Sequence, residues 1–182
     1  VLYRDKSVIS DVYMQRAQAG ISQEANEILD EFPITPDEMF RYDCVVAFDP
    51  DWQKLDQEQI ELLYDWVRKH SGGLIVIPGA VNAGRPIAGW TQDEAMQKIR
   101  ELYPVVFERR FSGSEEGMRG GSEPAKIAFT PEGLEADFLW ITDSPISNRE
   151  AWDSFPGVYS YFPVRGAKPI VGKVLARFGD EQ

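Results

Sequence analysis

The clearest pattern of apolar and polar positions lies between residues 43 and 77. Residues 44–48 and 74–77 are unbroken apolar runs, which is typical of strands that helices cover on both faces. Between them, Asp56 and Gln59 form a capping box in front of apolar positions at helical spacing. These positions are Ile60, Leu63, Tyr64 and Val67. The pattern predicts a strand, a helix and a second, parallel strand joined by a right-handed crossover.

Weaker patterns precede this unit. Residues 8–14 alternate in the manner of a strand, and residues 15–34 form a polar connection with a weakly helical patch at 23–29. Thr35, followed by Pro36 and Glu38, has the sequence of a helix start. We therefore expect a short helix that runs to Phe40.

The second half of the chain alternates short elements with loops rich in glycine and proline. Residues 78–89 predict a loop, and Thr91 with Glu94 predicts the cap of a helix that ends before Pro104. A second cap is predicted at Ser147 and Glu150. Strands are expected at 105–109, 126–130, 158–162 and 170–178. The Gly, Ser and Glu residues of 112–124 predict a poorly ordered hairpin or lid.

Length and charge narrow the classes of protein to which the chain can belong. Its 182 residues suit one domain spanning 1–182, and 43% hydrophobic residues suffice for a core. A formal charge of −11 with scattered basic residues argues against a nucleic-acid partner. The chain has no apolar run of membrane-spanning length. The sequence leaves open the compartment, cytoplasmic or periplasmic, and the oligomeric state.

Cysteine and histidine each occur once, as Cys44 and His70. An internal disulfide and a zinc site of the usual kind are therefore excluded within one chain, and we expect no metal and no cofactor. Cys44 lies inside an apolar run, which favours a small core residue. His70 follows the predicted helix, where an imidazolium complements the helix dipole.

Residues 42–49, the capped helix and residues 70–80 resemble the class I glutamine amidotransferase-like superfamily. The resemblance is closest to its non-catalytic branch, which includes trehalose-utilisation (ThuA-like) proteins and amidotransferase-like domains of large bacterial proteins. It covers residues 1–178, and only 42–90 is specific. It implies a flavodoxin-like α/β fold, a mostly parallel sheet with helices on both faces. It also implies a fragment of a longer protein that lacks the first strand of that sheet.

The resemblance also bears on catalysis. A working amidotransferase carries a cysteine on a tight turn after a strand, activated by a histidine and a carboxylate. The matching turn at residues 77–80 has no cysteine. This implies a pseudoenzyme that serves as a ligand-sensing or protein-assembly module in a larger bacterial protein. The alternative is a ThuA-like protein that binds or processes carbohydrate.

Polar and aromatic residues follow the two strands of the unit at 43–77. Ligands of open α/β sheets bind at the carboxyl ends of the parallel strands, so these residues are the candidate binding site for a polar ligand such as a sugar. They are Asp49, Asp51, Trp52, Asn82, Arg85 and Trp90. In the structural alternative, the polar side chains satisfy loop backbone groups and the tryptophans pack in the core.

Two further features have structural and functional interpretations. The glycines of 117–121 lack the order of a phosphate-binding motif, and neighbouring glutamates would repel phosphate. Late aromatic residues either cover a sheet face or bind another domain or protein. These are Trp140, Trp152, Phe155, Tyr159, Tyr161 and Phe162.

Overall fold

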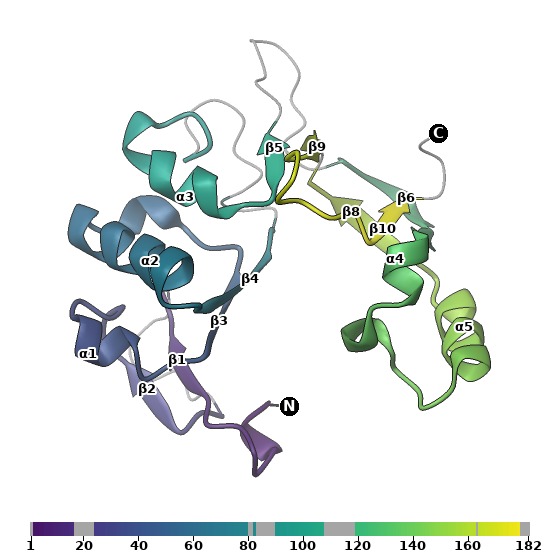
Figure 1. Cartoon of the computed structure of the whole chain (residues 1–182), viewed down its shortest axis with the longest axis horizontal. Helices are drawn as coiled ribbons and strands as arrows, with labels where there is room; N and C mark the ends of the chain where they lie inside the picture. Colours follow the sequence, from purple (N-terminus) through teal and green to yellow (C-terminus); the bar gives the residue numbers. More distant parts are fainter. Residues whose placement is uncertain are drawn as a thin grey trace. The chain divides into compact units, whose positions relative to one another are not determined.

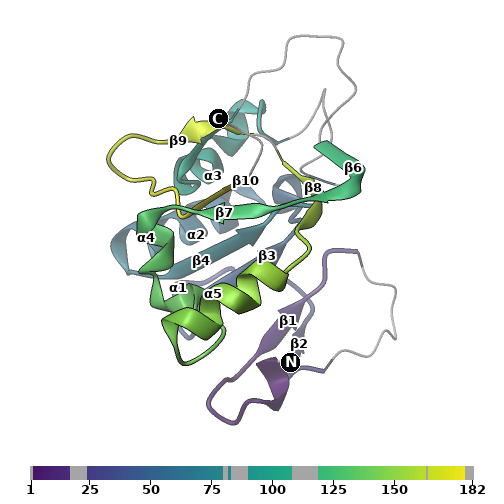
Figure 2. The ribbon, with the colours of Figure 1, turned by 90° about the vertical axis from the view of Figure 1, so that its right-hand side faces the viewer.

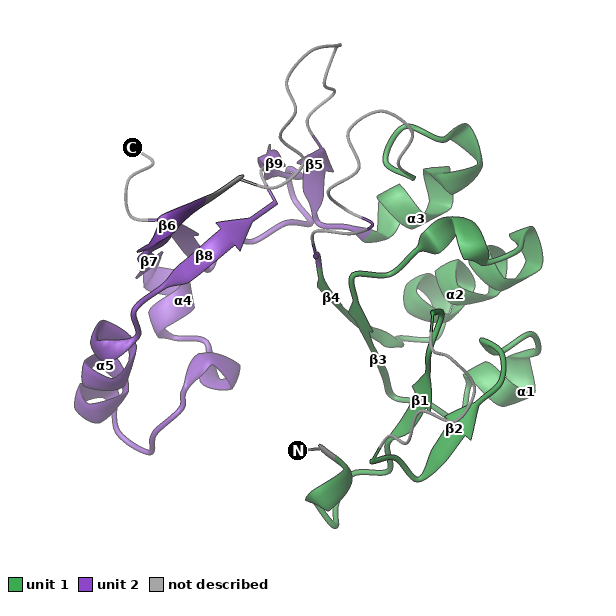
Figure 3. Cartoon of the chain, turned by 180° about the vertical axis from the view of Figure 1, so that it is seen from behind, with its two compact units in different colours: residues 1–77, 90–102 green, residues 78–89, 103–182 purple. Residues whose placement is uncertain are grey.

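The chain divides into two compact units, which are coloured separately in Figure 3. Unit 1 comprises residues 1–77 and 90–102, and unit 2 comprises residues 78–89 and 103–182. The structure is a computed structural model, and it describes residues 2–16, 24–79, 82, 90–107, 119–162 and 164–178. The expectation of a single domain over residues 1–182 stays a prediction.

Unit 1 contains two parallel strand pairs and three α-helices within its described residues (Figure 1). Its strands are β1 (Asp11–Tyr13), β2 (Glu27–Leu29), β3 (Cys44–Phe48) and β4 (Gly73–Ile77). Its α-helices are α1 (Pro36–Met39), α2 (Gln57–Lys69) and α3 (Gln97–Leu102). Short 3-10 turns are η1 (Leu2–Arg4), η2 (Trp52–Lys54) and η3 (Glu94–Met96).

The strands β3 and β4 form a parallel pair joined through α2. Their register sets Cys44 opposite Gly73, Val46 opposite Ile75 and Phe48 opposite Ile77. The helices α1, α2 and α3 all lie on one side of this pair, as Figures 1 and 3 show. The strand, helix and parallel strand predicted for residues 43–77 are therefore confirmed, but the helices of unit 1 cover only one face.

Capping boxes start both α1 and α2, as the sequence predicts. Asp56 Oδ1 accepts a hydrogen bond from Gln59 N at 2.8 Å, and Gln59 Oε1 accepts one from Asp56 N at 3.1 Å. Thr35 and Glu38 make the same reciprocal bonds at α1. These side chains satisfy backbone groups that a helix start leaves without partners.

The end of α2 is fixed by a close approach of the backbone to an aromatic ring. His70 and Gly72 both donate their backbone N–H to Trp66 O, each at 3.1 Å. A Cβ atom at Gly72 would overlap the ring of Trp66, so the tight connection from α2 to β4 requires glycine. The His70 ring packs on Phe40 with ring centroids 4.3 Å apart.

The buried hydrophobic side chains of the described residues all belong to unit 1. They are Phe32, Met39, Trp52, Leu55, Ile60, Leu63, Trp66, Trp90, Met96 and Ile99. A side chain of this kind stabilises the fold by about 1.5–3 kcal/mol when it is buried. Unit 1 therefore has a core of its own, centred on α2 and on the residues around α1 and α3.

Unit 2 contains three antiparallel strand pairs and two α-helices within its described residues. Its strands are β5 (Val105–Phe107), β6 (Arg119–Ala125), β7 (Ile127–Phe129), β8 (Val158–Tyr161), β9 (Val164–Ala167) and β10 (Ala176–Phe178). Its α-helices are α4 (Pro131–Leu134) and α5 (Pro145–Ser154), and η4 (Asp137–Leu139) is a 3-10 turn between them. The pairs are β5–β9, β6–β8 and β7–β10, and Figure 2 shows β6 and β7 following one another directly.

Aromatic contacts hold unit 2 together without fully burying any described hydrophobic side chain. Trp152 lies between Phe129 and Phe155, with ring centroids 4.9 and 5.8 Å away. Tyr161 stacks on Phe178 at 4.1 Å. The late aromatic residues therefore only partly cover the strands and helices that carry them. The hydrophobic side chains of unit 2 are accordingly less buried than those of unit 1.

The flavodoxin-like fold, with its mostly parallel sheet and helices on both faces, is wrong for the described residues. Their strands form five two-stranded sheets, three of which are antiparallel. None of these sheets is an extended parallel sheet with flanking helices. The apolar runs at 44–48 and 74–77 identified the strands correctly, but such runs do not determine how many neighbours a strand has.

Several single elements also differ from the prediction. The patch at 23–29 is not helical where it is described, because Glu27–Leu29 forms β2 and pairs with β1. The expected strand at 8–14 is reduced to β1. Residues 119–124, expected to be poorly ordered, lie in β6, which pairs with β8. For β2 and β6, pairing with a strand elsewhere in the chain decided the local structure.

Three expected starts and ends are shifted. The turn η3 ahead of α3 is capped by Asp93, whose Oδ1 accepts from Ala95 N at 3.0 Å, and not by Thr91. The helix α5 is capped by Ser144 instead of Ser147, since Pro145 suits the first helical position. The last strand covers only Ala176–Phe178 of the expected 170–178.

We expect Asp56→Ala to lower the free energy of unfolding by about 1 kcal/mol, because it removes the acceptor for Gln59 N at the start of α2. Urea unfolding followed by circular dichroism measures the change. Asp56→Ser, which keeps a capping oxygen, should stay close to the wild type. Equal stability of all three proteins would show that this cap is dispensable.

Candidate functional site

Three of the predicted site residues share the loop that follows β3. Asp49, Asp51 and Trp52 come directly after the strand, and Asp49 N donates to Ile77 O at 2.8 Å. Asp49 has a positive φ of 41°, which Asp tolerates better than most residues. The loop therefore turns sharply at the carboxyl ends of β3 and β4, the place where the sequence predicted a site.

The Asp51 end of this loop is tied to the segment after β1. Gln15 Oε1 accepts from Asp51 N at 2.8 Å, and Gln15 Nε2 donates to Asp51 O at 3.1 Å. Arg16 pairs with the Asp51 carboxylate at 3.2 Å, and Lys54 Nζ donates to Gln15 O at 2.7 Å. The polar groups at Asp51 thus serve to hold the loop in place.

The aromatic and later members of the predicted site behave differently. Trp52 and Trp90 are only 3% and 4% exposed, so their rings pack in the core of unit 1 and present no face for stacking on a ligand. Asn82 belongs to unit 2 and is buried. Arg85 lies outside the described residues. The grouping of Asn82 and Arg85 with the β3 loop stays a prediction.

An apolar surface covers the side of the β3–β4 pair that faces away from α2. We call it the β3–β4 face, and it consists of Cys44, Val46, Phe48, Ile75 and Ile77. All five side chains are exposed, and Phe48 is 70% exposed. They share one face because side chains alternate along a strand and the register aligns the two sets. The sequence did not reveal this surface, because continuous apolar runs do not tell which face is covered.

The exposure of Cys44 corrects its expected role as a core residue. The thiol lies at the start of β3, and a Cβ atom at Gly73 would sit 3.3 Å from its sulfur. His70 caps the end of α2, as predicted, and its ring packs on Phe40. Cys44 therefore lies on a strand face, and His70 lies at a helix end. Each residue has its own structural surroundings.

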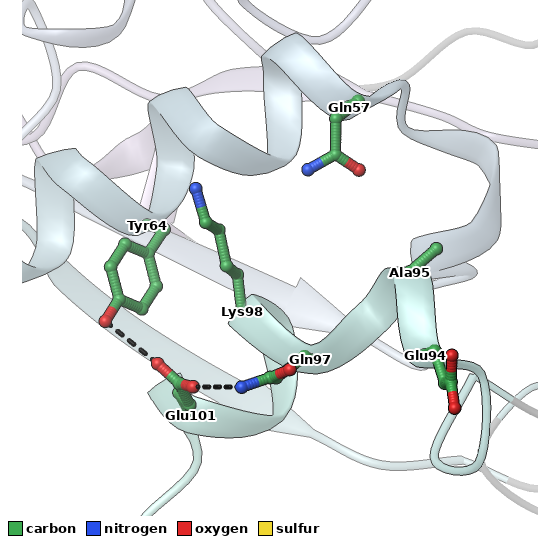
Figure 4. Close-up of a pocket in the computed structure, with 7 residues that line it drawn as sticks. All are labelled: Gln57, Tyr64, Glu94, Ala95, Gln97, Lys98 and Glu101. Carbon is green, nitrogen blue, oxygen red and sulfur yellow. Dashed lines mark hydrogen bonds between the residues drawn. The ribbon is translucent and has the colours of Figure 1, made fainter.

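A polar groove lies between α2 and α3 in unit 1, and Figure 4 shows the residues that line it. Its volume is about 320 Å³. The lining residues are Gln57, Tyr64, Glu94, Ala95, Gln97, Lys98 and Glu101. None of them was a predicted site residue, because the groove arises where two helices far apart in the sequence meet.

Hydrogen bonds order the side chains of this groove. Glu101 accepts from the Tyr64 hydroxyl at 2.9 Å and from Gln97 Nε2 at 3.0 Å, as Figure 4 shows. Lys98 Nζ lies 3.0 Å from a Glu61 oxygen and 5.7 Å from the centre of the Tyr64 ring. The Lys98 hydrogen bond holds the pKa of Glu61 below its usual range. The groove thus presents amides, a carboxylate and an ammonium to a polar ligand.

The described residues contain neither a metal-binding cluster nor a membrane-spanning helix. No three His, Cys, Asp or Glu side chains among them are grouped so as to hold a metal ion. No helix in these ranges is both long and apolar enough to cross a bilayer. In comparisons with known proteins, no family model, curated protein or solved structure matches the chain.

We expect Cys44 in the folded protein to react with a thiol reagent at nearly the rate of the urea-unfolded chain, because its side chain is exposed on the β3–β4 face. Absorbance at the wavelength of the released thiolate from Ellman's reagent follows the reaction. A thiol that reacts only after unfolding would show that this face is covered in solution.

Proposed function

We propose that the chain is a non-catalytic protein-assembly module whose β3–β4 face binds another polypeptide. One observation carries the proposal: five apolar side chains from two paired strands lie together on an exposed surface. Scattered exposed apolar residues are ordinary in soluble proteins, but a contiguous group of them marks an interaction surface. Aromatic anchors such as Phe48 contribute most to such contacts.

The charges near the face favour a particular kind of partner. Asp43 precedes β3 and Asp49 follows it, so a carboxylate stands at each end of the strand. Unit 1 as a whole carries more acidic than basic residues. Complementary charge at a rim speeds association and selects the partner. We therefore infer a partner segment with an apolar face flanked by lysine or arginine.

The non-catalytic part of the proposal rests on the sequence after β4. Residues 78 and 79 are Pro and Gly, and the only cysteine lies on β3 instead. The resemblance of residues 42–90 to the amidotransferase-like superfamily, and to its non-catalytic branch, stays a prediction. The exposed face supports assembly more than ligand sensing. Gln15 and Arg16 already bond to Asp51 in the loop after β3, so these polar groups of the loop are engaged within the fold.

Model peptides test the inferred chemistry of the partner. A labelled amphipathic peptide of leucine and lysine should bind the full chain, and its leucine–glutamate counterpart should not. Phe48→Ser should weaken binding about tenfold or more, the effect of losing one buried aromatic contact. Fluorescence anisotropy titrations measure the affinities.

Ile9→Ser is the matched control for this experiment, because Ile9 is an exposed aliphatic residue of unit 1 outside the β3–β4 face. It should bind the basic peptide as the wild type does. If both peptides bind equally well, the inferred charge of the partner is wrong. If Phe48→Ser binds normally, the face is not the docking surface.

A second candidate function, binding of a small carbohydrate, is favoured by the groove between α2 and α3. Amide, carboxylate and ammonium groups together with an aromatic ring are suitable partners for sugar hydroxyls and ring faces. In the unliganded groove, Glu101 is held by Tyr64 and Gln97, so its carboxylate is already oriented. A sugar would compete for these existing hydrogen bonds, and its binding would therefore be weak.

A panel of neutral mono- and disaccharides tests this second function by thermal unfolding. A ligand present at about ten times its Kd should raise Tm by a few degrees, and Glu101→Ala should abolish the shift. Asp65→Ala is the control, since Asp65 pairs with Lys69 and does not line the groove. An unchanged Tm across the panel would rule out carbohydrate as the ligand.

A further inference from the structure

The loop between β9 and β10 presents aliphatic side chains to solvent at its tip. Ile170 is 104% exposed and Val171 is 65% exposed. The loop, residues 168–175, belongs to unit 2 and can be followed in yellow in Figure 2. We call it the Ile170 loop. Neither side chain has a role in the proposed assembly face, which lies in unit 1.

The backbone of the tip is unfavourable for the residue that occupies it. Ile170 has a φ of 73°, in the left-handed region that β-branched residues rarely adopt. Glycine or asparagine would relieve this strain at no cost in contacts, because the side chain touches solvent. A positive φ at a β-branched residue indicates a functional role here, because neither stability nor solubility explains an isoleucine at this position.

Hydrogen bonds connect both ends of the Ile170 loop to neighbouring segments of unit 2, and one bond closes the loop on itself. Lys168 N donates to Pro104 O at 2.8 Å, and Gly172 N donates to Lys168 O at 2.9 Å. On the other side, Thr130 Oγ1 donates to Val174 O at 2.8 Å. The tip is therefore held in an ordered position, and the aliphatic side chains stay directed outward.

The stretch of sequence that contains the loop is basic in an acidic chain. Residues 164–178 contain no acidic residue, whereas the whole chain has 30 acidic and 19 basic residues. The basic residues of this stretch are Arg165, Lys168, Lys173 and Arg177. Lys168 is half-buried and the other three are exposed. The next acidic residue along the chain is Asp180.

We propose that the Ile170 loop docks on the surface of an anionic lipid bilayer. Ile170 and Val171 would enter the interface, and the exposed Lys173 would lie at the headgroups with its aliphatic stem beside the tip. Aliphatic side chains at the tip of a loop bind at the level of the lipid headgroups when cations flank them. The basic residues add an electrostatic attraction to the anionic surface, which falls off within a Debye length. This goes beyond the proposed assembly function and uses a different unit.

The shape of the tip favours a bilayer over an acidic protein as the partner. Two adjacent aliphatic residues with Pro169 beside them offer no side-chain hydrogen-bonding group to a folded surface. A fluid interface accepts such a protruding group without needing a matching pocket. One short loop with a few cations gives reversible attachment, because stable anchoring requires a second signal.

Sedimentation of the full chain with vesicles tests the proposal. Phosphatidylserine-rich vesicles should bind the protein, pure phosphatidylcholine vesicles should bind it far more weakly, and added salt should release it. Ile170→Gly should reduce the partition coefficient about tenfold. Lys173→Gln should reduce it about fivefold. Phe138→Ser should have no effect, because Phe138 is an exposed apolar residue of the same unit beside acidic residues.

The stability of Ile170→Gly separates a docking role from a structural one. Glycine accepts the positive φ, so this variant should unfold at the same temperature or a higher one while its vesicle binding falls. A lower Tm would show that Ile170 is structural and would overturn the proposal. Equal binding to both vesicle types, or wild-type binding by Ile170→Gly, would also overturn it. So would concentration-dependent self-association that Ile170→Gly abolishes without any vesicle binding by the wild type, which would identify a second copy as the partner.

Discussion

The parallel pairing of β3 with β4 is the constraint on which the organisation of unit 1 depends. The two strands are joined through α2, which begins at the Asp56 capping box and ends where Gly72 packs against the Trp66 ring. A shift of one residue would turn Phe48 and its neighbours toward α2 and expose Val45 and Ala47 instead. The same pairing therefore decides which side chains form the core and which five form the β3–β4 face.

The sequence predicted those features that depend on neighbouring residues. The caps at Thr35 and Asp56 and the unit at 43–77 are confirmed, because each is determined within one short segment. The sheet was predicted wrongly, since pairing of strands far apart in the chain is not encoded by local periodicity. Residues 27–29 show this most directly, where pairing with β1 replaces the expected helix.

The same difference between local and long-range features applies to the candidate site. The sequence correctly placed Asp49 and Asp51 after a strand, but the tryptophans it offered for stacking are core residues. An aromatic residue in a loop has the same sequence signature whether its ring is buried or exposed. The groove between α2 and α3 could not be predicted, because its lining comes from residues 57–64 and 94–101, which meet only through tertiary packing. Cys44 was misjudged because one face of β3 is open.

The shifted pKa values among the described residues belong to groups that have structural roles. Catalytic sites shift pKa values through burial and close charges. Here the lowered carboxylate pKa values have local causes: Ser7 acts on Asp5, backbone N–H groups act on Glu38, Lys98 acts on Glu61, and Gln53 acts on Asp93. Burial raises the pKa of Tyr42, whose hydroxyl donates a hydrogen bond to Asp11 in β1. Glu38 and Asp93 cap α1 and η3, Glu61 links α2 to α3 through Lys98, and Tyr42 joins its loop to β1. The exposed apolar side chains of the β3–β4 face have no such role within the fold, and for this reason we propose them as the assembly surface.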